Sequence, residues 1–578
     1  MPESVTPTRY ALTLEIVPRR DHFRGTADIR VRFDTARSAL WLHGHELDVT
    51  RAEVRLADGT ARAARWVAGS REGIGSLRWA GAIEPGEVTL HLEYTAPFGR
   101  HLEGLYRVDN EGDAYAFTQF EDIRARRAFP GFDEPRFKTP FDLTLVVEEG
   151  HRAVTNTAEV ESTPRPDGLR AVRFAPTEPL PTYLLAFAVG PLDVVDAPAI
   201  PANGVRSTPL PFRGVAARGR GNALGRALAD TPALVRALEE YFNYPYPYPK
   251  LDVIAVPDFG AGAMENAGAI TFRESLLLVR PGAPADQPRA LAYVMAHELA
   301  HHWFGNLVTL RWWDDIWLNE SFATWMGTRV TDQVYPQHRQ SLSMLVGIHH
   351  AMNTDALSSS APVRRPIETD ADLRGGSSAI VYQKGSSVLG MFERFLGETA
   401  FRDALRGYMR AHAHGTATSA DLFADFAAAA QGRPVEESLR TFVDQAGVPL
   451  IEADVRCDAN GRTLTFAQRP FTLPAGAQPA TRTWKVPVCA RYPDGATVRE
   501  RCELVANERV EVSLGRGVCP AWVMPNANAQ GYYRWTVRPA LLDALRTRAW
   551  ATLTVPERLS IVNNARAAFT AGALDTAA

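Results

Sequence analysis

The spacing of hydrophobic residues changes twice along the chain, and this limits the folds that the chain can adopt. Over about the first 195 residues apolar and polar positions alternate, as in Gly25–Phe33. A period of two places the apolar residues on one face of a β-strand. Between about 224 and 430 the spacing becomes helical, and from about 449 to 537 the alternation returns. The sequence therefore predicts a β domain, a mainly helical domain and a second β domain, in that order.

Residues rich in proline and glycine mark the first border, since 196–214 hold four prolines and two glycines. We expect a multidomain α+β chain. Its predicted parts are an N-terminal β-sandwich-like domain at 1–195, a mainly helical domain at 196–447, a small β-sandwich domain at 448–537, and the beginning of a helical C-terminal domain at 538–578.

The composition argues against several classes of function. The 578 residues include 63 Lys and Arg against 66 Asp and Glu, a net charge of −3, which gives no electrostatic reason to bind nucleic acid or an anionic membrane. No stretch approaches the roughly 20 apolar residues that cross a bilayer, and the first residues lack the pattern of a secretory signal. We therefore expect a cytoplasmic protein. The four cysteines, all between 457 and 519, do not argue for a disulfide framework, although a local bridge stays open.

The strongest local motif is His297-Glu298-Leu299-Ala300-His301. On a helix, positions i and i+4 lie on one face, so both imidazoles can bind one metal ion. Glu298 lies about 100° round the helix, where it can reach a metal-bound water without being a ligand. The alternative is two partly exposed histidines beside a glutamate on the helix surface.

A third metal ligand is expected from Glu320, which follows His301 after eighteen intervening residues. That distance allows the helix to end and a second helix to return. By itself, Glu320 would be a solvated carboxylate in a first helical turn. The flanking residues Trp317, Leu318 and Phe322 indicate instead that it is buried, and a buried carboxylate needs a partner. Two histidines and one glutamate would leave the fourth position of a catalytic zinc ion open for water.

A second motif, Gly262-Ala263-Met264-Glu265-Asn266, lies upstream. Glycines allow a ligand to approach the backbone closely, and Glu265 is a lone carboxylate beside them. Taken alone, the motif is a glycine-led loop or strand edge with one acid. A carboxylate so placed could bind an ammonium group.

These motifs, with the Trp317–Ser321 segment WLNES, together resemble the signature of the gluzincin aminopeptidases, the M1 family of the alanyl, puromycin-sensitive and endoplasmic-reticulum aminopeptidases. The resemblance extends over nearly the whole chain. Residues 119–145 resemble the N-terminal domain of that family, and residues 380–393 resemble its catalytic-tyrosine segment. The resemblance implies a thermolysin-like fold for the helical domain.

The resemblance also implies roles for individual residues. One zinc ion per chain would be held by His297, His301 and Glu320. Glu298 would be the general base, and the Tyr382 hydroxyl would stabilise the oxyanion.

The implied substrate-binding residues lie in two segments, and Glu265 among them would hold the free amino terminus of the substrate. They are Gln119, Glu121, Gly262, Ala263, Met264, Glu265 and Asn266. Asp315 is expected to accept a hydrogen bond from a ligand histidine.

The implied function is a zinc aminopeptidase that hydrolyses the N-terminal peptide bond of peptides with a free amino terminus and releases single amino acids. One alternative is the leukotriene-epoxide hydrolase branch, which shares these motifs but lacks the small β domain. The other is a catalytically weak, peptide-binding relative. It would need a broken ligand or base, and none is broken here.

The C-terminal segment resembles only the beginning of the large helical domain that full-length family members carry. Residues 538–578 contain apolar positions at near-helical spacing, and so few helices cannot bury them among themselves. We expect an exposed apolar patch, or a partner that covers it: a second copy of the chain or a separately encoded helical subunit.

Overall fold

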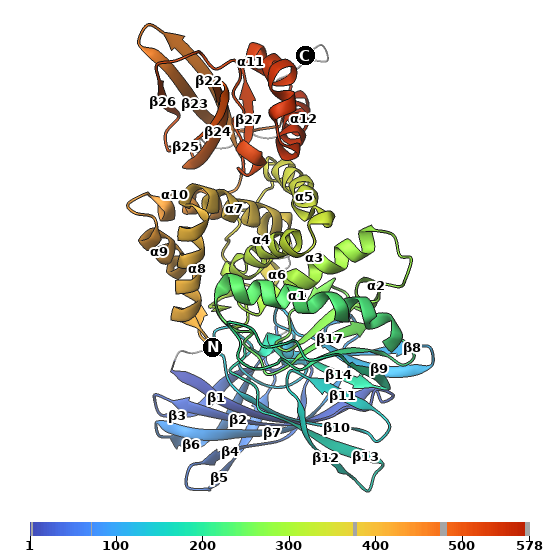
Figure 1. Ribbon diagram of the computed structural model, residues 1–578. Helices are drawn as coiled ribbons and strands as arrows, with labels where there is room; N and C mark the ends of the chain where they lie inside the picture. The colour runs from blue at the N-terminus through green and yellow to red at the C-terminus, as the bar shows by residue number, and fades with distance from the viewer. Residues whose placement is uncertain (2–3, 71, 374–377, 474–481, 573–578) are drawn as a thin grey trace. The chain divides into compact units, whose positions relative to one another are not determined.

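The computed structural model describes residues 1, 4–70, 72–373, 378–473 and 482–572. Their contacts divide the chain into two compact units. The first unit comprises Met1–Trp313 and His412–Ala417, and the second comprises Asp314–Ala411 and Thr418–Ala578. Figure 1 labels helices and strands of both units.

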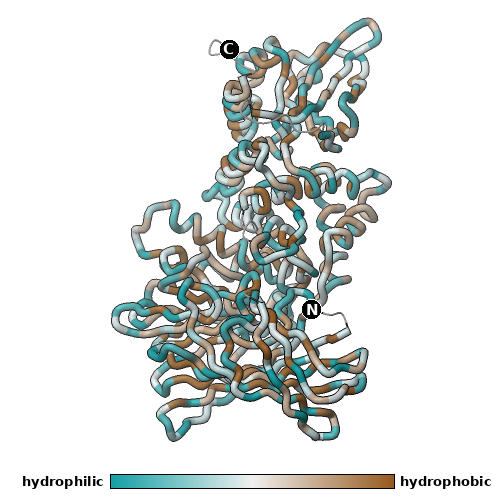
Figure 2. Tube along the Cα trace, turned by 180° about the vertical axis from the view of Figure 1, so that it is seen from behind, coloured by the Kyte–Doolittle hydropathy of each residue, from teal (hydrophilic) through white to brown (hydrophobic). Residues whose placement is uncertain are grey.

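A ten-stranded sheet forms most of the predicted N-terminal β domain, with the strand order β12-β13-β10-β1-β2-β7-β4-β5-β6-β3. Its strands are β1 (Val5–Glu15), β2 (His22–Phe33), β3 (Arg37–His43), β4 (Asp48–Leu56), β5 (Ala61–Val67), β6 (Ile74–Ile83), β7 (Gly86–Pro97), β10 (Phe141–Glu148), β12 (Glu159–Pro164) and β13 (Leu169–Phe174). The alternation predicted for β2 is confirmed, because Ala27, Ile29 and Val31 are fully buried. Figure 2 shows hydrophobic and hydrophilic residues alternating along these strands.

A four-stranded sheet in the order β11-β14-β9-β8 belongs to the same domain. Its strands are β8 (Gly104–Asn110), β9 (Asp113–Gln119), β11 (Arg152–Thr155) and β14 (Phe187–Gly190). Strand β14 begins at Phe187, after a 3-10 turn at Thr182–Leu184. The last residue of β9 is Gln119, one of the predicted substrate-binding residues.

A five-stranded sheet follows in the first unit, in a region that was expected to be mainly helical. Its strands, in the order β15-β16-β17-β19-β18, are β15 (Leu192–Asp196), β16 (Phe212–Ala217), β17 (Leu251–Val256), β18 (Ala263–Met264) and β19 (Ala269–Arg273). Strands β16, β17 and β19 run parallel, and β18 lies antiparallel at the edge. Every residue of β17 is buried, so its sequence shows no alternation by which a strand would be recognised.

Three helices accompany this sheet: α1 (Gly225–Phe242), α2 (Glu274–Leu277) and α3 (Asp286–His301). Helix α1 contacts strand β16 and helix α3. Figure 1 shows α1 beside α3. Helices α1 and α3 both lie within the segment from about 224 to 430 for which the sequence predicts helical spacing. The short strands β20 (Thr309–Leu310) and β21 (Thr416–Ala417) pair in parallel beyond the end of α3.

The second unit begins with the rest of the helical region. Its helices are α4 (Trp317–Val334), α5 (Gln340–Asp355), α6 (Asp370–Leu373), α7 (Gly385–Leu396), α8 (Glu398–His412), α9 (Ser419–Ala429) and α10 (Val435–Val443). A π-helical turn, Ile380–Lys384, leads directly into α7. Helix α9 begins with a capping box, in which Thr418 and Asp421 each hydrogen-bond the backbone of the other.

The predicted small β domain is present in the second unit. Four strands pair in the order β26-β23-β22-β27, and a hairpin adds β24 and β25. The strands are β22 (Pro449–Asp458), β23 (Gly461–Pro470), β24 (Val486–Asp494), β25 (Thr497–Val505), β26 (Arg509–Gly515) and β27 (Arg534–Val537).

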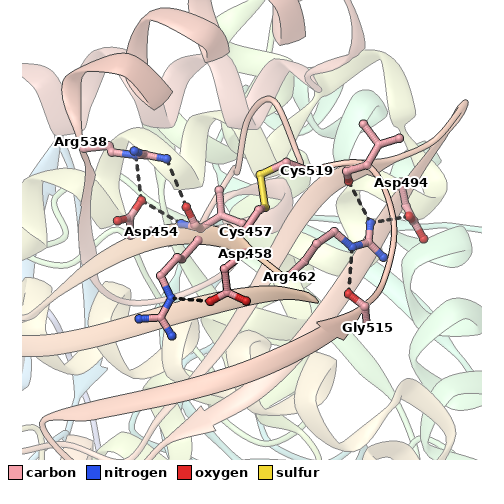
Figure 3. The surroundings of a disulfide bond; sticks show 11 residues. Asp454, Cys457, Asp458, Arg462, Asp494, Gly515, Cys519 and Arg538 are labelled. Atoms are coloured by element: carbon pink, nitrogen blue, oxygen red, sulfur yellow. Dashed lines mark hydrogen bonds and ion pairs between the residues drawn. A yellow bond between two sulfur atoms is a disulfide. The ribbon is translucent and has the colours of Figure 1, made fainter. Parts of the chain in front are cut away.

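Two disulfides cross-link this domain, so the local bridge left open by the sequence is found twice. They join Cys457 to Cys519 and Cys489 to Cys502. Beside the first disulfide, the buried guanidinium of Arg462 donates to the Gly515 carbonyl, with Nε 3.2 Å from the oxygen. Figure 3 shows these groups around the bridge.

The last described residues form helices, as predicted: α11 (Pro539–Ala544), a π-helical turn and a 3-10 turn, and α12 (Val555–Thr570). Helix α12 packs against α5 and β27. The expected exposure of apolar side chains is found only in part. Leu545 and Leu553 are buried, whereas Trp550 and Phe569 are 39% and 53% exposed. Among the described residues, no helix is long and apolar enough to cross a membrane.

Candidate metal centre

Helix α3 carries the His-Glu-x-x-His motif in its last turns. Leu291, Met295 and Leu299, at spacings of four residues, are buried and hold one face of the helix in the core. Asp286 lies in the first turn, where a carboxylate interacts favourably with the helix dipole. The motif therefore sits on a rigid helix rather than on a loop.

The two histidines of the motif lie on the same face of α3, as the sequence predicts. Both are buried, and Nε2 of His297 lies 3.1 Å from Nε2 of His301. Two nitrogen ligands of a tetrahedral zinc ion, each about 2.0–2.1 Å from the metal, are about 3.3 Å apart. The imidazole pair already has nearly that separation. The alternative of two partly exposed histidines is wrong.

The second nitrogen of His301 fixes the orientation of its ring. Nδ1 lies 3.1 Å from the carbonyl oxygen of Phe304. A hydrogen bond from Nδ1 to this oxygen leaves Nε2 as the lone-pair nitrogen, which is the form that binds a metal.

His302 takes no part in this arrangement. Its ring stacks on Tyr246 at a centroid distance of 5.0 Å, and its Nδ1 lies 3.2 Å from the Glu298 carbonyl oxygen. Burial lowers the pKa of His302 to about 3, so the ring is neutral.

Two buried carboxylates lie beside the histidine pair. Glu265, Glu298 and His301 form a group whose candidate ligand atoms all lie within 4.8 Å of one another. Glu265 Oε1 is 3.8 Å from Nδ1 of His301. The Glu298 carboxylate therefore lies close to the imidazole of His301, one of the two histidines that share a face of α3.

The glycine-led motif forms the edge of the five-stranded sheet. Ala263 and Met264 are the two residues of β18, so the interpretation as a strand edge is confirmed. A Cβ atom added to Gly262 would meet no atom within 4 Å, so the backbone there faces open space. The Asn266 side chain donates to Thr271 Oγ1 over 3.1 Å, which holds the turn between β18 and β19.

The N-terminal domain reaches this motif through Gln119. Its Nε2 lies 3.4 Å from Sδ of Met264. Glu121, two residues further on, is partly buried. Gln119 therefore ends β9 and contacts the glycine-led motif directly, and Glu121 follows two residues after the strand.

A partly buried lysine and a buried asparagine, which the sequence did not single out, hold the loop after α3. Lys138 Nζ donates to the carbonyls of Asn306, Leu307 and Gly415 at 2.8, 3.0 and 3.2 Å. The Asn306 side chain in turn donates to the Glu265 carbonyl at 2.8 Å. Short-range sequence patterns carry no signal for such contacts, because 168 residues separate Lys138 from Asn306.

Glu320 lies in the first turn of α4 in the second unit, and its side chain is buried, with 4% of the residue exposed. Its neighbours hold this turn in place. Trp317 Nε1 donates to Ser419 Oγ over 2.8 Å, and Ser321 Oγ donates to the Val381 carbonyl over 2.6 Å. The interpretation of Glu320 as a solvated carboxylate is wrong.

The three predicted zinc ligands form one group. The candidate ligand atoms of His297, His301 and Glu320 all lie within 4.8 Å of one another, and all three residues are buried. Two imidazole nitrogens and one carboxylate are a ligand set that suits catalytic zinc. A buried carboxylate beside two imidazoles also gains from a cation. The residues present therefore fit a zinc ion.

Tyr382 lies in the π-helical turn Ile380–Lys384 of the second unit and is partly buried. Two residues later, Lys384 Nζ lies 2.9 Å from the Asp355 carboxylate, and neither side chain is exposed. Burial lowers the pKa of Lys384, and Asp355 opposes this effect.

Asp315 has partners other than the one expected. Its carboxylate accepts from Arg364 Nε at 2.9 Å and from the Ser419 backbone at 3.0 Å. These contacts give it a role in holding the start of α4 instead of orienting a histidine.

Comparison with known proteins agrees with this site. The model of the peptidase family M1 domain matches residues 226–445, and that of the peptidase M1 N-terminal domain matches residues 6–184. The chain is 32% identical to puromycin-sensitive aminopeptidase of Caenorhabditis elegans, over 100% of the chain and 61% of the relative. It is 29% identical to endoplasmic reticulum aminopeptidase 1 of Homo sapiens, over 98% of the chain and 63% of the relative. It is 33% identical to probable aminopeptidase 1 of Saccharolobus solfataricus, over 80% of the chain and 56% of the relative. The chain thus spans about three fifths of the length of these relatives.

Proposed function

Because the chain belongs to peptidase family M1, we propose that it is a zinc aminopeptidase that removes single residues from the free amino terminus of peptides. The observation that carries this proposal is the buried group of His297, His301 and Glu320. The matched relatives named above are aminopeptidases, which supports the same reaction.

Zinc, when bound by these three residues, would polarise the scissile carbonyl and lower the pKa of a water molecule towards about 7. Glu298 would take the proton of the attacking water and pass it to the leaving amine. Its position supports this role, since it follows a ligand on α3 and lies among the buried polar groups of the site.

The tetrahedral intermediate carries its new negative charge on the former carbonyl oxygen of the substrate. The hydroxyl of Tyr382 would donate a hydrogen bond to that oxygen. A phenol that is already positioned needs little reorganisation when the charge develops, which is why a well-held tyrosine suits this task.

Glu265 and Glu121 would pair with the protonated amino terminus of the substrate. Glu265 is buried, and an ion pair formed where water is largely excluded is stronger than one at the surface. Such pairing fixes the amino terminus one residue from the scissile bond, which would make the enzyme an exopeptidase.

The small β domain bears on the choice between the aminopeptidases and the related epoxide hydrolases. That domain is present at β22–β27, and the epoxide hydrolase branch is expected to lack it. The aminopeptidase reaction is therefore the better proposal. A purely peptide-binding role has less support, because the chain has all three proposed zinc ligands and the proposed base.

A matched pair of peptides tests this function. One has a free amino terminus and the other is acetylated there, with the sequence otherwise the same. We expect the free peptide to lose single residues from its amino terminus, as seen by mass spectrometry, and the acetylated peptide to stay intact. Glu265→Ala should slow cleavage of the free peptide and leave the acetylated one as poor as before. Efficient internal cleavage of the acetylated peptide would contradict the proposal.

A further inference from the structure

A buried ion pair lies next to the turn that carries Tyr382. Lys384 Nζ is 2.9 Å from Asp355 Oδ2, and both side chains are fully buried. Lys384 ends the π-helical turn Ile380–Lys384, and Asp355 ends helix α5. The pair therefore joins the tyrosine turn to a second helix of the same unit.

The Asp355 carboxylate also accepts hydrogen bonds from the segment that leads into the small β domain and from Tyr532, two residues before β27. Oδ1 accepts from the Gly447 backbone at 2.8 Å and from Ser360 Oγ at 2.7 Å. Oδ2 accepts from the Tyr532 hydroxyl at 3.1 Å. Tyr532 and Tyr533 directly precede β27, so the small β domain contributes to the same network.

The ammonium group of Lys384 is satisfied as well. Besides Asp355, it donates to the carbonyls of Gln445 and Gly447 at 3.1 and 3.4 Å. Its nitrogen also lies 5.7 Å from the centre of the Tyr532 ring. Fully satisfied buried polar networks are rigid and define one geometry.

The other side of the turn is held by the helix that carries Glu320. Ser321 Oγ donates to the Val381 carbonyl over 2.6 Å. The packing there is so close that a Cβ atom on Gly385 would lie 1.9 Å from Ser321 Oγ. The backbone is therefore fixed immediately before Tyr382 and again two residues after it.

We propose that Asp355, Lys384 and Tyr532 are positioning residues that hold the Tyr382 hydroxyl in place, and that the small β domain supports catalysis through them. The inference rests on the proposed function only in that Tyr382 stabilises the oxyanion. A π-helical turn is uncommon and frequently occurs at functional sites. It needs contacts such as these to favour it over a continuous α-helix.

Stability alone does not explain the pair. Two buried charges pay a large desolvation cost, and well-packed apolar residues of similar size often stabilise a fold equally well. The network sets a geometry, and the group whose geometry matters most in this segment is the Tyr382 phenol.

The chain offers a closely matched pair of variants. Tyr532→Phe removes one hydrogen bond to Asp355. Tyr533→Phe removes the bond to the Pro525 carbonyl, which Tyr533 donates at 3.0 Å, from an equally buried neighbour outside the network. We expect Tyr532→Phe to lower kcat about tenfold with KM and zinc content unchanged, and Tyr533→Phe to behave like wild type. Equal kcat for the two variants would overturn the proposal.

A double-mutant cycle separates positioning from general weakening. Lys384→Met should lower kcat in the wild-type background and have no further effect when Tyr382 is already Phe, because it acts through the lost hydroxyl. An equal loss in both backgrounds would mean that the ion pair is only structural. Where Lys384→Met does not fold, Tyr532→Phe takes its place in the cycle.

A measurement without turnover keeps this inference separate from the proposed function. 3-Fluorotyrosine incorporated at position 382 gives a ¹⁹F resonance that reports the surroundings of the ring. Tyr532→Phe should shift or broaden that resonance, and Tyr533→Phe should leave it unchanged. An inactive wild type would contradict the proposed function alone, whereas a resonance that Tyr532→Phe does not alter would contradict the positioning role.

Discussion

The side-chain amide of Asn306 donates a hydrogen bond to the backbone carbonyl of Glu265 over 2.8 Å. This contact connects the loop after α3, which carries the proposed zinc ligands, to the segment that would bind the substrate amine. Both residues are buried, with Asn306 only 1% exposed. The distance between the proposed metal ligands and the proposed amine-binding carboxylate is therefore set partly by one side chain.

Asn306→Ala should weaken substrate binding more than zinc binding. Without the amide, the Glu265 carbonyl loses a buried donor, and the segment that carries the carboxylate can shift. We expect KM for a free peptide to rise about tenfold, with the zinc content unchanged. Steady-state kinetics and metal analysis on one preparation measure both. A variant that loses its zinc but keeps its KM would contradict this role.

Tyr382→Phe should retain zinc and lower kcat by about 10² to 10³, the scale usual for one oxyanion donor. The phenyl ring keeps the packing and removes only the hydroxyl. Kinetics at saturating substrate measure the effect. A change confined to KM would show that the hydroxyl acts on the ground state and not on the oxyanion.

His349 should make the protein sensitive to acid. It is buried on α5, and burial, with a smaller effect of the nearby Arg534 guanidinium, lowers its pKa from 6.5 to about 4. Between these values the unfolded chain binds the proton more readily than the folded one. Stability is thus lost as the pH falls from about 6.5 to about 4, at up to about 1.4 kcal/mol per pH unit.

Urea unfolding at several pH values tests this behaviour. His349→Gln should reduce the dependence of the unfolding free energy on pH in that range. The exposed neighbour His350 provides the control variant His350→Gln on the same helix. If the two variants kept the same pH dependence as wild type, another group would be responsible.

The two disulfides should differ in how much they stabilise the small β domain. Cys457 and Cys519 are separated by 62 residues, and Cys489 and Cys502 by 13. In the chain-entropy model, the longer loop is worth about 4 kcal/mol and the shorter about 3 kcal/mol. Calorimetry on the two double alanine variants should find the larger loss for the first pair. The reverse order would show that local packing outweighs loop entropy.

The cytoplasmic location expected from the sequence stays a prediction. Disulfides form and persist mainly in oxidising compartments, and all four cysteines are paired in the structure. A count of free thiols in protein isolated from its native cells would test the location. Four free thiols would agree with the cytoplasm, and none would favour an oxidising compartment.

Much of the site could be predicted because its geometry is local. Two histidines four residues apart must share a helix face, and this is found for His297 and His301. The apolar neighbours of Glu320 correctly indicated its burial. The order of the β, helical and small β parts followed from the spacing of apolar residues alone. An element with one buried and one exposed face shows the period of its secondary structure in its sequence.

Other features could not be predicted because they depend on distant contacts or on complete burial. Strand β17 is buried on both faces, so it gave no alternation, and its sheet was missed. The contact of Lys384 with Asp355 and that of Lys138 with Asn306 join residues far apart in sequence. The pairing of the cysteines likewise depends on strand register, as for Cys489 opposite Cys502.

The most direct test of the account is to measure zinc content and turnover in Glu298→Gln, with Glu320→Ala prepared in parallel. Glu298 is proposed as the base and Glu320 as a ligand, so the two variants should fail in different ways. Glu298→Gln should keep one zinc ion per chain and lose activity by several orders of magnitude, whereas Glu320→Ala should lose most of its metal. Wild-type turnover in Glu298→Gln, or full zinc occupancy in Glu320→Ala, would contradict the account.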